Sequence, residues 1–82
     1  MPKKLVERAQ TGVRIEKSLL KVLKGLAEYC DLTMGDLLEG IVLHAFEGRS
    51  PFDSESIKRS DALKQIYGMD YDISAAHNFI EE

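Results

Sequence analysis

The chain has 82 residues and a formal net charge of −3, with 44% hydrophobic and 30% charged residues. This length suits one small domain, and the composition is that of a globular protein rather than a disordered one. The single cysteine excludes an internal disulfide and fits a reducing compartment. No stretch has the length and apolarity of a transmembrane helix or a signal peptide, so we expect a cytoplasmic protein with no membrane partner.

The charges are distributed unevenly along the chain. Residues 1–25 carry seven basic and two acidic residues, whereas residues 26–82 carry four basic and twelve acidic ones. Such an asymmetry indicates a nucleic-acid-binding face that the net charge of the whole chain conceals. The alternative is a basic helix face that is merely solvated.

Residues 1–7 are predicted to be a flexible basic arm, and residues 8–15 a short strand. Within this strand one face would hold Thr11, Val13 and Ile15, and the other Gln10, Gly12 and Arg14. A lone strand leaves its backbone N–H and C=O groups unpaired, and the sequence shows no second strand. The simplest partner is the same strand of another copy, which predicts a homodimer. The alternative is an edge strand or ribbon without a ligand.

Helical periodicity predicts the next two elements. Residues 16–31 form the first helix, in which Gly25 indicates a close helix crossing. Residues 34–47 form the second helix, with Thr33 as its N-cap. The apolar stripe of this second helix comprises Met34, Leu37, Leu38, Ile41, Val42, Ala45 and Phe46. The first helix and the strand are too small to bury this whole apolar stripe. We therefore expect that a dimer interface or the C-terminal region buries the rest.

Gly48 and Pro51 mark the clearest boundary in the chain. A third helix is expected over about 54–67, and a fourth short helix over 73–81. The apolar side of the third helix would comprise Ile57, Leu63, Ile66 and Tyr67. The chain therefore divides into the arm, residues 1–7, a core, residues 8–48, and an acidic helical extension, residues 49–82.

Neither catalysis nor a cofactor is indicated by the sequence. His44 and His77 do not stand at metal-ligand spacing with Cys30 or with paired carboxylates. We expect Cys30 to be a small buried hydrophobe and His44 a partly exposed structural residue. The chain has no Gly-rich phosphate loop and no nucleophile elbow, so we expect a protein that is not an enzyme and binds neither metal nor cofactor.

Residues 10–47 resemble the ribbon-helix-helix family of bacterial and phage transcription factors, which includes the Arc, MetJ and CopG repressors. The resemblance rests on Thr11-Gly12-Val13-Arg14-Ile15 as the strand, on the leucines of residues 19–26 in the first helix, and on Thr33-Met34-Gly35-Asp36-Leu37-Leu38 at the start of the second. It implies a mainly α fold in which one short N-terminal strand pairs with its dimer mate, followed by two core helices and one or two C-terminal helices.

The same resemblance implies that the paired strands enter the major groove of double-stranded DNA. Bases would be contacted by Gln10, Gly12 and Arg14, with Arg14 on guanine and Gln10 on adenine. Phosphates would be contacted by Lys3, Lys4, Lys17, Thr33, Met34 and Gly35. The dimer core would comprise Thr11, Val13, Ile15, Leu38, Ile41 and Val42.

Three functions follow from these expectations. The first is a homodimeric, sequence-specific DNA-binding transcriptional regulator that represses by occupying its operator. The second is an antitoxin-type protein whose C-terminal region, residues 49–82, binds a protein partner. The third is a dimeric interaction module that does not bind DNA.

Overall fold

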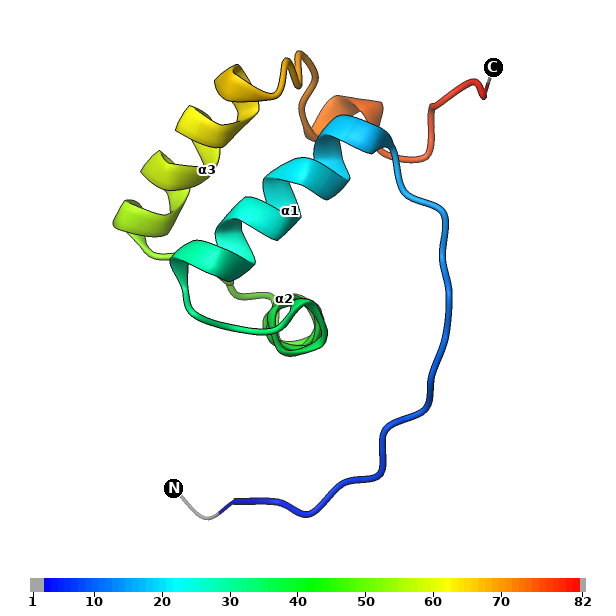
Figure 1. Ribbon diagram of the computed structural model, residues 1–82, viewed down its shortest axis with the longest axis vertical. Coiled ribbons are helices and arrows are strands. Elements are labelled where there is room, and N and C mark those ends of the chain that lie inside the picture. Colours follow the sequence, from blue (N-terminus) through cyan, green and yellow to red (C-terminus); the bar gives the residue numbers. More distant parts are fainter. Residues whose placement is uncertain (1–2, 82) are drawn as a thin grey trace.

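Three helices and one short turn make up the regular structure of the computed structural model, which describes residues 3–81. The elements are α1 (Lys17–Tyr29), α2 (Met34–Phe46), α3 (Ser54–Ile66) and the 3-10 turn η1 (Ile73–Ala75). Figure 1 shows α3 beside α1 and α2 on the other side of α1, while the N-terminal segment runs outside the helices. Residues 1–2 of the predicted arm and residue 82 of the predicted extension lie outside the described part. No helix within residues 3–81 is long and apolar enough to cross a membrane.

The predicted strand over residues 8–15 is wrong. These residues form an irregular, extended segment that passes beside α2 (Figure 1), and no strand or sheet occurs among residues 3–81. A strand exists through its ladder of hydrogen bonds to a neighbour. The described part of the chain provides no such neighbour, so the mainly α ribbon-helix-helix fold with an N-terminal strand is replaced by an all-helical one.

The three main helices lie close to their predicted positions because local caps define their starts. The Thr33 hydroxyl accepts a hydrogen bond from the backbone N–H of Asp36 at 3.1 Å, and Asp53 accepts one from Ser56 at 2.8 Å. After α2 the chain turns through Gly48, whose φ of +67° suits glycine. The predicted helix over 73–81 is wrong, because only η1 forms and His77 then adopts a φ of +66°.

The core forms where α1 packs between α2 and α3. Its buried members are Val22, Leu26, Ala27 and Leu37. Gly25 is the site of the close crossing, because a Cβ added there would lie 2.8 Å from Cδ2 of Leu63 on α3. The predicted apolar side of α3 is correct only for Leu63, which packs against the core, since Ile57, Ile66 and Tyr67 are exposed. Ser60 is buried instead, and its hydroxyl donates to the carbonyl of Ile57 at 2.8 Å.

Candidate nucleic-acid interface

The residues expected to contact bases lie on the extended N-terminal segment, defined here as residues 3–16. Gln10, Gly12 and Arg14 are all exposed. A Cβ added at Gly12 would meet nothing within 4 Å. The segment therefore presents an amide and a guanidinium to solvent on either side of an uncrowded glycine, a chemistry that suits base edges.

Glu16 occupies the amide end of α1. Its carboxylate accepts hydrogen bonds from the backbone N–H groups of Ser18, at 3.0 Å, and Leu19, at 3.1 Å. It also accepts from the hydroxyl of Ser18 and, at 2.7 Å, from that of Tyr71. These bonds, those with Ser18 first, lower the pKa of Glu16 to about 2. The backbone N–H groups of Ser18 and Leu19 therefore already bind a carboxylate and do not serve as a phosphate site.

Tyr71 is the partner of Glu16 from the far end of the chain. Burial of its phenol, followed by the hydrogen bond to Glu16, raises the pKa of Tyr71 to about 12. The hydroxyl is therefore a donor at neutral pH, and it joins residues that stand 55 positions apart in the sequence.

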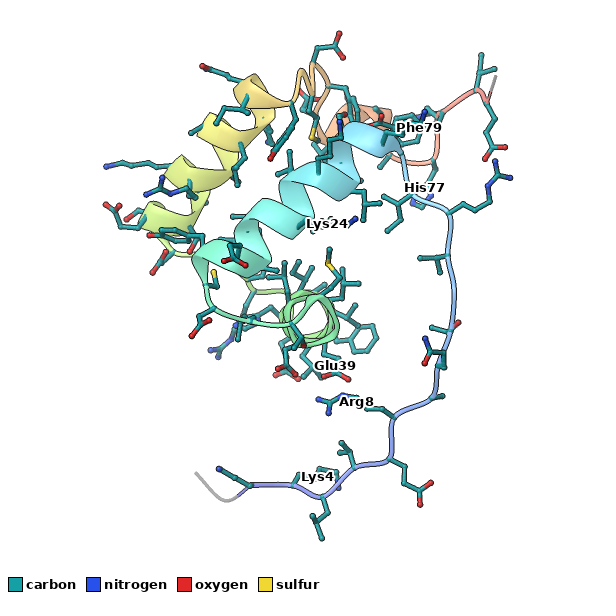
Figure 2. The ribbon with its side chains drawn as sticks, in the orientation of Figure 1. Lys4, Arg8, Lys24, Glu39, His77 and Phe79 are labelled. Carbon is teal, nitrogen blue, oxygen red and sulfur yellow. The ribbon has the colours of Figure 1, made fainter. Side chains whose placement is uncertain are left out.

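Arg8 crosses from the N-terminal segment to α2, as Figure 2 shows for its side chain beside Glu39. Its guanidinium donates twice to the Glu39 carboxylate, at 2.9 and 3.1 Å, and once to Asp36 at 3.1 Å. The hydrogen bond to Glu39 raises the pKa of Arg8, and the same bond lowers the pKa of Glu39. Arg8 thus neutralises two carboxylates near the start of α2, which would otherwise repel a phosphate there.

The start of α2 carries three of the expected phosphate contacts. The Thr33 hydroxyl is engaged by the Asp36 backbone N–H. Met34 and Gly35 occupy the first turn, where backbone N–H groups have no partner inside the helix and the helix dipole favours an anion.

A single copy does not gather the expected phosphate contacts into one patch. Lys17 begins α1 and Thr33 follows its end, and thirteen helical residues span about 18 Å. Lys4 lies at the far end of the N-terminal segment (Figure 2). A duplex would have to contact the protein at several separate places, or two copies would have to contribute.

The residues expected in a dimer core are incompletely covered in the single chain. Thr11 is exposed and Val13 is 74% exposed, while Ile15, Leu38 and Ile41 are half-buried. The C-terminal half of α2 is more open still. Its exposed apolar residues, which we call the outer face of α2, are Val42, Leu43, Ala45 and Phe46. Such a group of exposed apolar side chains on one helix is typical of an interaction surface.

Cys30 and His44 lie on one groove of the surface. Cys30 is half-buried at the C-cap of α1, rather than fully buried as expected. His44 is exposed, with Nδ1 2.7 Å from the carbonyl oxygen of Gly40. Both line a shallow, open groove of about 190 Å³ beside Phe52. Among the residues that the structure describes, no three His, Cys, Asp or Glu side chains gather as metal ligands would.

Sequence reasoning missed three contacts: those of Arg8 with α2, of Tyr71 with Glu16, and of Glu81 with Arg14. Glu81 Oε2 lies 3.6 Å from Arg14 Nη1. The opposite charges of the N-terminal and C-terminal parts were a signal that the two ends would attract each other. Nothing in the spacing of the residues identified which carboxylate would meet which cation.

Compared with protein-family models, with curated proteins and with solved structures, the chain has no match in any of the three. The resemblance of residues 10–47 to a family of transcription factors therefore stays a prediction from the sequence, and the function is argued from the site itself.

Proposed function

We propose that this protein is a homodimeric DNA-binding transcriptional regulator that represses by occupying its operator. The observation that carries the proposal is the extended N-terminal segment, which runs outside the helices (Figure 1) and in which Gln10 and Arg14 are exposed. The basic excess of residues 1–25 supports it, because phosphate attraction supplies most of the affinity of such proteins for DNA.

In this proposal Arg14 and Gln10 are the base-reading residues. A guanidinium donates two hydrogen bonds to O6 and N7 of guanine, and an amide pairs with N6 and N7 of adenine. Gly12 lies between them and has no Cβ to hold the backbone away from the base edges. Lys17 and the backbone N–H groups of Met34 and Gly35 contact phosphates, which orients the protein without specifying sequence.

The homodimer is supported by the outer face of α2. Phe46 is 79% exposed, Leu43 is 63% exposed and Val42 is 44% exposed, all on one short helix. Burial of these side chains against a second copy removes apolar surface from water, which is the main driving force of association. In a single copy the expected phosphate contacts do not form one patch. A dimer doubles their number, so that two copies together can contact one duplex.

The first experiment is selection from a random-sequence duplex pool at low and at physiological salt, followed by sequencing of the bound fraction. We expect enrichment of a short motif and an affinity that falls steeply with salt. Retention that disappears with salt and enriches nothing would leave only backbone contacts. No retention even at low salt would refute DNA binding and leave a dimeric interaction module.

Arg14→Ala tests base reading directly. We expect it to weaken binding to the selected site by about 1–3 kcal/mol and to relax the preference at one base pair. Arg49→Ala is the matched control, because it removes an exposed arginine from the turn between α2 and α3. An equal loss on every sequence would show that Arg14 contacts phosphate rather than a base.

A protein partner for residues 49–82 is the second candidate function. It is favoured by the exposure of Ile66, Ile73 and Ile80, which are 71%, 90% and 95% exposed. Because α3 already packs on α1, such a partner would meet a folded surface rather than order a disordered tail. Slow amide hydrogen exchange in α3 of the free protein would count against an antitoxin-type tail.

A further inference from the structure

The C-terminal segment, defined here as residues 71–81, folds back onto the start of α1. Tyr71 donates to Glu16 at 2.7 Å. The ring of Phe79 meets the Tyr71 ring edge-on, with centroids 5.0 Å apart and an interplanar angle of 79°. Figure 2 shows Phe79 at the end of the molecule where α1 begins. The segment is therefore joined to this turn by the hydrogen bond from Tyr71, and the edge-on contact with Phe79 folds the end of the segment back onto Tyr71.

The turn of chain between these contacts is defined locally. Asp72 caps η1 by accepting from the backbone N–H of Ser74 at 2.9 Å. After η1, His77 adopts a left-handed conformation with a φ of +66°, which reverses the direction of the chain. These features bring the end of the segment beside residue 14.

At the end of the segment, the carboxylate of Glu81 lies beside Arg14, the proposed base-reading arginine. Glu81 Oε2 lies 3.6 Å from Arg14 Nη1. The two side chains are 73% and 88% exposed, so water screens the pair and little energy is needed to separate it. A DNA phosphate or a base edge that approached Arg14 would compete with this carboxylate.

We propose that the C-terminal segment is a displaceable acidic cover that competes with DNA for Arg14. The proposal rests on the DNA-binding function proposed above. Tyr71 joins the segment to Glu16 at the start of α1, Phe79 packs on Tyr71, and Glu81 stays paired with the Arg14 guanidinium until a stronger polyanion replaces it. A weak, exposed ion pair suits this role, because it lowers DNA affinity without blocking it.

The experiment measures binding of the full chain to a random-sequence duplex at low salt by fluorescence anisotropy. We expect Glu81→Gln to lower the Kd about two- to fivefold, the range of an exposed ion pair. Phe79→Ala is expected to lower the Kd as well, because it removes the ring contact with Tyr71 that folds the end of the segment back towards Arg14. Phe79 is 51% exposed, so its truncation leaves the core between α1, α2 and α3 intact.

Glu55→Gln is the matched control. Glu55 is 72% exposed and makes one exposed ion pair, with Lys58 at 3.8 Å, at the start of α3. It therefore removes the same charge from a similar environment away from Arg14. If Glu81→Gln binds no tighter than Glu55→Gln while the wild type binds DNA, the cover is refuted and the DNA-binding function stands. If no variant binds at low salt, both proposals are refuted.

Discussion

Glu16 links the start of α1 to the C-terminal segment. Its carboxylate caps α1 and accepts a hydrogen bond from the Tyr71 hydroxyl. Its pKa falls from 4.5 to about 2 on folding. The stabilisation that Glu16 provides is therefore fully present above pH 4.5 and is lost as the pH falls through 2.

We expect the free energy of unfolding to decrease between pH 5 and pH 2, and Glu16→Gln to remove part of this decrease. Urea unfolding over a series of pH values measures it. Glu28→Gln, at an exposed position on the same helix, is the control for the loss of one negative charge. The acid sensitivity that remains in Glu16→Gln is expected from other carboxylates with lowered pKa values, namely Glu39, Asp53 and Asp72. Parallel curves for wild type and Glu16→Gln would contradict the prediction.

A glycine at position 25 is favoured by the close approach of Leu63 and not by the backbone conformation of Gly25 itself. An added Cβ would lie 2.8 and 3.0 Å from the two methyl groups of Leu63 and 3.4 Å from its Cγ. Overpacking of this kind costs about 1–3 kcal/mol, whereas alanine gains about 1 kcal/mol over glycine in helix propensity.

We therefore expect Gly25→Ala to destabilise the wild type by about 1 kcal/mol. In a Leu63→Ala background the obstruction is gone, and the same substitution is expected to stabilise by about 1 kcal/mol. Chemical unfolding of the four proteins gives the double-mutant cycle. The same sign in both backgrounds would show that Leu63 is not the constraint.

At the scale of the element, the stability of α2 depends on its N-cap because few of its side chains are buried. Leu37 is the buried residue of the helix, and its C-terminal half is open to water. We expect Thr33→Ala to lower the free energy of unfolding by about 1 kcal/mol, while Thr33→Ser, which keeps the hydroxyl, changes it little. Urea unfolding of the three proteins measures both. An equal loss in the serine variant would assign the effect to the methyl group instead of the cap.

Local chemistry explains which elements could be predicted. The helices begin at Thr33 and Asp53, whose side chains accept from the third residue beyond them. Such contacts are readable because both partners are close in the sequence. The strand prediction for residues 8–15 failed because alternation describes a surface that needs a partner, and the described chain supplies none.

At the scale of the whole molecule, the outer face of α2 is the contact between copies in the proposed homodimer. We expect sedimentation to show a weight that rises with protein concentration, and Phe46→Glu to shift the protein towards monomer. Ile66→Glu is the control, because Ile66 is a similarly exposed apolar residue near the end of α3. A wild type that stays monomeric at high concentration would remove the homodimer from the proposal.

The sequence by itself determined what depends on neighbours a few residues apart: three helices, the Thr33 cap of α2, the turn at Gly48, and the basic N-terminal and acidic C-terminal parts. Tertiary structure alone decided that Leu63 meets Gly25, that Arg8 engages Glu39, and that Tyr71 and Glu81 approach Glu16 and Arg14. These pairs join residues far apart in the chain, so their geometry depends on how α1 packs between α2 and α3. No local periodicity or propensity encodes that packing, because it results from burial of the whole apolar surface at once.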